Sequence, residues 1–310
     1  MAYLPFIDRR TFLKTLLASS AAIGFAPPAW SLAPSPLIKK TIPKTGEKIP
    51  ALGMGSWITF NVGPDAELRT ERTKVLKAFF EAGGGLVDSS PMYGSSEAVI
   101  GHCLNKLAYP KGLFSATKVW TPLKSRGISQ MQNSMKLWGI KKFDLLQIHN
   151  LVDWEAHLAT LKDMKAKGQV RYIGITTSHG RRHGEFAQIM KTEPIDFVQF
   201  TYNIDDREAE NQLLPIAQDK GLAVIINRPF QRGSLIDRFA AHPLPGWASE
   251  IGCKTWPQFL LKFIISHPAV TCAIPATSQV AHMKENMAAA LGTLPDEKTR
   301  ARMIAYCNAL

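Results

Sequence analysis

The sequence has only four cysteines in 310 residues, at positions 103, 253, 272 and 307. No two of them stand in the Cys-x-x-Cys spacing that zinc sites and dithiol redox motifs use. This absence argues against a metalloprotein and against a disulfide scaffold. We expect no bound metal and four isolated thiols, with pairing of Cys253 and Cys307 left open.

Two further absences limit the domain organisation. No Gly-x-Gly-x-x-Gly run opens a helix after the first strand-like segment, which argues against a dinucleotide-binding Rossmann domain. No linker rich in proline, glycine or serine divides residues 50–290. We therefore expect one large domain in this part of the chain.

The chain also lacks a basic stripe interleaved with aromatic residues, the pattern that stacks nucleic-acid bases. Its formal net charge is nevertheless +12. Because the basic residues are scattered through helix-like segments, the charge favours anionic small molecules or solubility. We expect no nucleic-acid partner.

The first 33 residues differ from the rest of the chain. The stretch DRRTFLK (8–14) precedes a short apolar run, TLLASSAAIGFA, and the triplet Ser31-Leu32-Ala33 then offers a small-x-small cleavage site. This order is typical of an export signal, and the paired arginines resemble a twin-arginine signal. We predict a twin-arginine signal peptide over 1–33 and a mature domain over 34–310, exported folded by the twin-arginine translocase to the periplasm. The apolar run is too short to span a bilayer well, so we expect no stable membrane anchor. An ordinary amphipathic helix is the alternative.

Strand-like and helix-like segments alternate beyond this region. Amphipathic patterns with terminal glycines predict helices over 70–84 and 155–169, and two apolar runs around KTGEK, within 37–57, predict a hairpin. Eight strand-like segments separated by helices predict an α/β fold, the closed (β/α)8 or TIM barrel, with a parallel sheet. These segments are 51–57, 86–90, 113–120, 143–150, 170–178, 196–203, 222–230 and 270–277.

Four ionisable residues fall near the ends of consecutive strands. Asp88 ends an apolar run, Tyr93 lies in the loop after it, Lys118 lies in SATKVW and His149 lies in LLQIHN. The carboxyl ends of the strands are where such barrels carry their chemistry. A lysine beside a phenol would lower the pKa of the phenol from about 10 towards neutral pH. An aspartate would fix the lysine, and a histidine could donate a hydrogen bond to a polarised carbonyl oxygen.

The stretch VDSSPMYGSSEAVIG (87–101) resembles the D-x-(A/S)-x-x-Y-G-x-S-E-x-x-(I/V)-G signature of the aldo-keto reductases. SATKVW and LLQIH are similar to the lysine and histidine motifs of that family, and the likeness covers residues 37–290. It implies a barrel whose N-terminal hairpin closes the bottom, and an NAD(P)H-dependent reductase that turns aldehyde or ketone carbonyls into alcohols. In that reading Tyr93 donates the proton, Lys118 and Asp88 tune it, and His149 orients the carbonyl.

The resemblance also assigns cofactor positions. Thr277 and Ser278 can hydrogen-bond a 2′-phosphate, so NADPH is expected, with NADH as the alternative because Ala276 and His282 stand where NADP-selective members carry Lys and Arg. Asn227 stands where many members place a tyrosine under the nicotinamide. The expected cofactor-binding residues are Ser56, Trp57, Thr176, Thr177, Gln199, Arg228, Ala276, Thr277, Ser278, His282, Glu285 and Asn286.

Trp57 and Trp120 align with apolar rim positions of the substrate pocket, with core packing as their alternative role. The segment after residue 290 is short, so we expect an open pocket for a small-molecule carbonyl substrate in a monomeric enzyme. The alternative function is a nucleotide-binding sensor or partner-binding subunit on the same barrel, with little turnover. A metal-dependent hydrolase is disfavoured because the strands carry no cluster of metal ligands.

Overall fold

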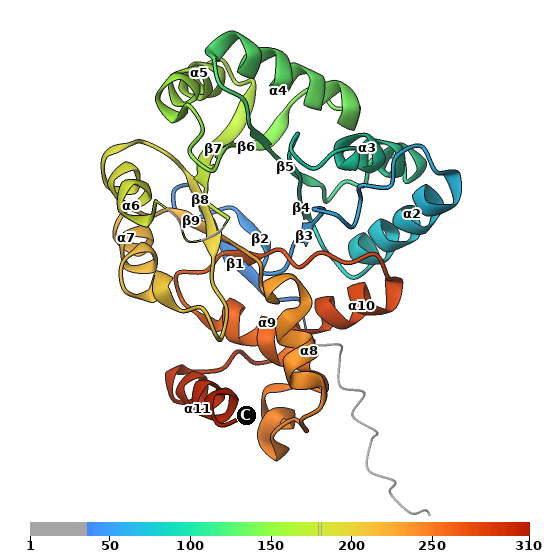
Figure 1. The fold of residues 1–310 in the computed structure, drawn as a ribbon, viewed down its shortest axis with the longest axis vertical. Coiled ribbons are helices and arrows are strands. Elements are labelled where there is room, and N and C mark those ends of the chain that lie inside the picture. Colours follow the sequence, from blue (N-terminus) through green and yellow to red (C-terminus); the bar gives the residue numbers. More distant parts are fainter. Residues whose placement is uncertain (1–35, 179, 181) are drawn as a thin grey trace, which may run out of the picture. The chain divides into compact units, whose positions relative to one another are not determined.

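Eight parallel strands form the centre of the structure, a computed structural model that describes residues 36–178, 180 and 182–310 (Figure 1). Each strand pairs with the next along the chain, in the order β3-β4-β5-β6-β7-β8-β9-β10. The predicted (β/α)8 barrel is confirmed. The predicted signal peptide, 1–33, lies outside the described residues. The strands are β3 (Met54–Gly55), β4 (Leu86–Asp88), β5 (Phe114–Val119), β6 (Phe143–His149), β7 (Val170–Thr176), β8 (Phe197–Thr201), β9 (Ala223–Asn227) and β10 (Cys272–Ala273).

A glycine allows the first and last strands of the barrel to meet. Gly53 N donates to Ala273 O at 2.9 Å, and Ala273 N donates to Ala51 O at 3.0 Å. These bonds join the segment leading into β3 to β10 and close the barrel. A Cβ at Gly53 would lie 2.7 Å from Leu86 O of β4 and 3.1 Å from Cys272 Sγ of β10, so the close approach requires glycine.

Helices surround the strands in Figure 1, and both predicted helices are present as α2 and α5. Asp65 caps α2 by accepting a hydrogen bond from Leu68 N at 2.9 Å, and the helix ends before the predicted glycines. The helices are α2 (Ala66–Glu81), α3 (Ser96–Lys106), α4 (Lys124–Trp138), α5 (Trp154–Ala166), α6 (His183–Thr192), α7 (Leu213–Asp219), α8 (Ser234–Ala240), α9 (Trp256–Ser266), α10 (Val280–Ala288) and α11 (Glu297–Asn308), with 3-10 turns η1 (Glu208–Glu210), η2 (Gln231–Gly233) and η3 (Gly246–Ile251).

The predicted hairpin closes the N-terminal end of the barrel. Strands β1 (Lys39–Thr41) and β2 (Lys48–Pro50) pair antiparallel. Ile42 and Ile49 pack into the same apolar cluster as Phe114 and Phe197, which begin β5 and β8. The hairpin therefore seals the end of the barrel opposite to the polar residues.

Side chains inside the barrel change from apolar to polar along the strands. The cluster at the hairpin end includes Phe114, Leu145 and Phe197. Because residues two apart in a strand face the same side, the same inward rows continue into polar residues near the strand ends. These buried polar residues are Asp88, Lys118, Gln147, His149, Thr176, Gln199, Thr201 and Asn227.

All four cysteines are buried and free, so Cys253 and Cys307 do not form a disulfide. Burial raises the pKa of Cys253 to about 11 and that of Cys307 to about 12. Such thiols stay protonated and are poor nucleophiles.

Among the described residues, no helix has the length and apolar character that a membrane span requires.

Candidate active site

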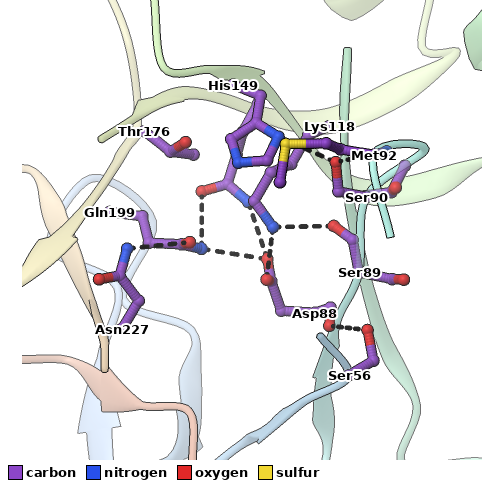
Figure 2. Close-up of polar contacts among 12 residues, drawn as sticks. Ser56, Asp88, Ser89, Ser90, Met92, Lys118, His149, Thr176, Gln199 and Asn227 are labelled. Carbon is purple, nitrogen blue, oxygen red and sulfur yellow. Dashed lines mark hydrogen bonds and ion pairs between the residues drawn. The ribbon is translucent and has the colours of Figure 1, made fainter. Parts of the chain in front are cut away.

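A buried ion pair lies among the polar residues at the strand ends (Figure 2). Lys118 Nζ contacts Asp88 Oδ2 at 2.5 Å and donates to Ser89 O at 2.8 Å. Burial by itself would lower the pKa of Lys118, but the Asp88 charge and the neighbouring Tyr93 outweigh it and raise that pKa. The lysine is therefore charged at neutral pH.

The second carboxylate oxygen of Asp88 is held by two amides. Gln147 Nε2 and Gln199 Nε2 each donate to Asp88 Oδ1 at 3.1 Å; Figure 2 labels Gln199 and Asp88. Ser56 Oγ donates to the main-chain oxygen of Asp88 at 2.9 Å. An ionised carboxylate only accepts hydrogen bonds, so both glutamines must turn their NH2 groups towards it.

Tyr93 lies in the tight loop between β4 and α3. Its N–H donates to Ser90 O at 2.9 Å, and Gly94 follows with φ +60°. A Cβ on Gly94 would lie 2.4 Å from Asn61 Oδ1, so the turn requires glycine. This turn places the centre of the Tyr93 ring 5.2 Å from Lys118 Nζ.

The pKa of the Tyr93 phenol is raised above its ordinary value. Burial has the largest effect and raises the pKa, the Lys118 ammonium lowers it, and the Asp88 carboxylate raises it again. The lysine lowers the pKa as predicted, but it does not bring the pKa towards neutral pH, because desolvation of the phenolate outweighs its attraction. The phenol keeps its proton at neutral pH, which is the state that a proton donor needs.

His149 lies beside Tyr93 at the end of β6. The two rings meet edge to face, with centroids 5.8 Å apart and an interplanar angle of 85°. Ser90 Oγ accepts a hydrogen bond from Met92 N at 3.2 Å and lies 2.9 Å from His149 Nδ1. When the Ser90 hydroxyl donates a hydrogen bond to Nδ1, Nδ1 carries no proton. The imidazole proton then lies on Nε2, which can donate a hydrogen bond.

No role was predicted for Glu97, the glutamate of the 87–101 stretch, but the structure gives it one. Its carboxylate accepts hydrogen bonds from Thr117 Oγ1 at 2.6 Å, Ser134 Oγ at 2.9 Å and Trp138 Nε1 at 3.2 Å. Burial nevertheless raises the pKa of Glu97. The residue fastens α3 and α4 to β5 directly beside Lys118, so it supports the lysine rather than facing the cavity.

A cavity of about 1060 Å³ opens beside Tyr93 and brings together most of the predicted site. It runs from His149 to the first residues of α10. Five predicted residues do not line it: Lys118, Trp120, Thr176, Thr177 and Ser278. The predicted residues that do line it are Ser56, Trp57, Asp88, Tyr93, His149, Gln199, Arg228, Ala276, Thr277, His282, Glu285 and Asn286.

Trp120 does not line the cavity, because the chain leaves the barrel after β5 and its main chain is bound to α4. Strand β5 ends at Val119, and Gln130 on α4 then binds the Trp120 main chain, accepting from N at 2.6 Å and donating to O at 3.0 Å. The Trp120 side chain is left 42% exposed. Of the two predicted tryptophans, the structure therefore places only Trp57 against the cavity.

A second wall of the cavity is formed by the segment after β9 together with the start of α9, and of its residues only Arg228 was predicted. The wall includes Phe230, Arg232, Lys254 and Trp256. Three non-glycine residues within five positions of this wall have positive φ values: 49° at Arg228, 47° at Gln231 and 63° at Arg232. Such conformations are costly and concentrate at functional sites. None of the described residues after Asn286 lines the cavity, so this wall comes from the β9–α9 segment and not from the C-terminal segment.

The residues present fit a dinucleotide at its phosphates. Arg228, Arg232 and Lys254 line the cavity, and no described carboxylate forms an ion pair with any of them. Burial and the charge of Arg232 lower the pKa of Arg228, as expected for basic groups that lie close together in one wall. Guanidinium groups in this state are suited to phosphate oxygens. Asn227 has no ring that could stack under a nicotinamide, and its Nδ2 donates to Thr177 O at 2.9 Å.

Comparison with known proteins agrees with this geometry. The model of the Aldo/keto reductase family matches residues 51–303. The chain is 27% identical over 256 residues to the methylglyoxal reductase YeaE of Escherichia coli (strain K12), covering 81% of this chain and 89% of the relative. It is 25% identical over 244 residues to the NADH-specific methylglyoxal reductase of the same organism, covering 67% of this chain and 71% of the relative.

Solved structures show the same barrel. The thermostable aldo-keto reductase Tm1743 in complex with the inhibitor epalrestat superposes with a TM-score of 0.72 at 28% identity, covering 87% of this chain and 99% of that chain. An aldo/keto reductase from Klebsiella pneumoniae in complex with NADP and acetate gives a TM-score of 0.73 at 24% identity, covering 87% and 95%. The second likeness shows the fold alone.

Proposed function

This chain belongs to the aldo/keto reductase family, and from this premise we propose that it reduces aldehyde or ketone carbonyls to alcohols with NADPH. The observation that carries the proposal is the environment of Tyr93. A protonated phenol faces the cavity, the charged Lys118 ammonium lies 5.2 Å from its ring centre, and Asp88 holds that lysine at 2.5 Å. A binding protein without turnover has no chemical need for this set.

The chain supplies the proton and the electrostatics of the reaction. Bound reduced nicotinamide would supply the hydride to the carbonyl carbon. Tyr93 Oη would give its proton to the carbonyl oxygen, and the Lys118 ammonium stabilises the negative charge that then develops on Oη. Asp88 keeps the lysine charged and in place, while His149 donates a hydrogen bond to the carbonyl oxygen. Arg228, Arg232 and Lys254 would hold the phosphates.

The cofactor assignment rests on the far end of the cavity. Ala276, Thr277 and His282 line it there, and the Thr277 hydroxyl offers a hydrogen bond to a 2′-phosphate. The neutral Ala276 weakens the preference for the phosphate, and one relative is named an NADH-specific enzyme. Fluorescence titration with NADPH and NADH in parallel decides between them, with tighter NADPH binding expected.

Small 2-oxoaldehydes are the first substrates to test. Two relatives are named methylglyoxal reductases, and each matches over more than two thirds of its own length, 89% and 71%. Steady oxidation of NADPH by an activated aldehyde or ketone is the expected result. Tight cofactor binding without oxidation by any member of an aldehyde and ketone panel would favour the sensor function instead.

We also propose that the enzyme is exported folded by the twin-arginine route, acts in the periplasm as a monomer, and loses residues 1–33. The pair Arg9-Arg10 ahead of the apolar run supports this location. Because free nicotinamide nucleotides are cytoplasmic, the exported enzyme would need to retain its cofactor tightly. Replacing both arginines with lysine should keep the protein in the cytoplasmic fraction, and unchanged export would refute the route.

A further inference from the structure

We propose that Gln147 positions the Asp88–Lys118 pair behind Tyr93 without touching cofactor or substrate. The inference rests on the proposed reductase function. Gln147 lies on β6 as the register partner of Lys118 on β5, so both side chains project into the same layer of the barrel. It has no exposed surface and is not among the residues lining the cavity.

The contacts of Asp88 show why its carboxylate needs hydrogen-bond donors besides Lys118. Lys118 occupies Oδ2, and Oδ1 receives its hydrogen bonds from Gln147 and Gln199 at 3.1 Å each. A buried ion pair persists only when hydrogen bonds also satisfy its remaining lone pairs, because desolvation of the two charges is costly. Gln147 therefore stabilises the ionised form of Asp88 and fixes the direction in which Oδ2 faces Lys118.

Gln147 also orients its neighbour. Gln199 Nε2 lies 3.4 Å from Gln147 Oε1, so the Gln147 oxygen helps to turn the Gln199 amide towards Asp88. Gln199 lines the cavity and Gln147 does not. A substitution at Gln147 therefore changes the positioning of the ion pair without removing a contact to a ligand. A substitution at Gln199 would change both at once.

The test compares Gln147→Leu with Gln147→Glu. The leucine variant removes one hydrogen bond to a buried charge, and kcat should fall by about tenfold or more at every pH, with the Kd for NADPH unchanged. The glutamate variant is close in shape, but it can donate to Asp88 only when protonated. Its kcat relative to wild type should therefore rise by about tenfold as pH falls from about 8 to about 5.

This recovery in acid distinguishes positioning from a packing role, which would give a ratio that does not change with pH. Gln258→Glu is the matched control, because Gln258 is also buried but only accepts a hydrogen bond, from Lys254 N at 2.8 Å. Its ratio to wild type should stay constant. A constant ratio for Gln147→Glu, or a wild-type kcat in Gln147→Leu, would overturn the proposal.

A second readout does not depend on turnover. The tyrosinate absorbance of the protein minus that of Tyr93→Phe follows the ionisation of Tyr93 alone. In Gln147→Leu the looser Lys118 stabilises the phenolate less, so the midpoint should move up by about half a pH unit or more. An unchanged midpoint would refute the positioning role, whereas absence of turnover in the wild type would refute the reductase function alone.

Discussion

The guanidinium of Arg232 stacks on the ring of Trp57, with its carbon 4.5 Å from the ring centre. Trp57 follows β3 and Arg232 lies in the η2 turn after β9, and both line the cavity. The stack therefore joins the two walls of the cavity at residues that are far apart in the sequence.

Removing the stack should weaken cofactor retention. Arg232→Ala loses a cation–π contact and one charge facing the phosphates, and the Kd for NADPH should rise by about 3- to 30-fold. Stopped-flow release of NADPH should accelerate to match. Arg302→Ala is the control, because Arg302 stacks in the same way on Trp247, at 4.2 Å, and neither residue lines the cavity. An equal effect in both variants would contradict the role of the stack.

Gly94→Ala should disturb both stability and catalysis. The residue has φ +60°, and its new Cβ would meet Asn61 Oδ1 at 2.4 Å, so the turn that presents Tyr93 must shift. We expect a loss of about 1–3 kcal/mol in the free energy of unfolding and at least a tenfold lower kcat. Gly46→Ala shares the left-handed φ, +75°, but meets nothing within 4 Å. It should cost about 1 kcal/mol and leave kcat unchanged.

His267 should make the stability of the protein depend on pH. Burial, with the nearby Arg300 charge second, lowers the pKa of folded His267 from 6.5 to about 4; Glu210 opposes this and Lys40 adds to it. Between these two values the unfolded chain binds a proton that the folded chain does not, so the free energy of unfolding falls as pH drops. Urea unfolding at pH 7 and pH 5 should show a smaller drop in His267→Gln than in wild type. His242→Gln serves as the control and should keep the wild-type drop.

The framework of the site could be predicted from the strands. Polar residues at strand ends, such as Asp88, Lys118 and His149, follow from the alternation of buried positions and the parallel order of a barrel. Relationships between strands could not be predicted in the same way. The proposed role of Gln147 depends on the register that pairs it with Lys118, and that register is a property of the folded sheet.

Two further features depend on tertiary structure. The raised pKa of Tyr93 follows from burial, which the small residues of the 87–101 stretch did not indicate. The wall formed by Phe230, Arg232 and Trp256 depends on the path of a long connection between β9 and α9. The cluster of basic residues directly after a strand end, in NRPFQRG (227–233), is the signal that could have pointed to that wall.

The role of Tyr93 as proton donor is tested by comparing Tyr93→Phe with wild type, using residues 34–310, NADPH and methylglyoxal. Loss of the phenolic proton should lower kcat by at least about 100-fold, because His149 orients the carbonyl but does not take the place of Tyr93 Oη, while the Kd for NADPH stays within about twofold. Steady NADPH oxidation by the wild type that continues undiminished in Tyr93→Phe would contradict the assignment of Tyr93 as the proton donor.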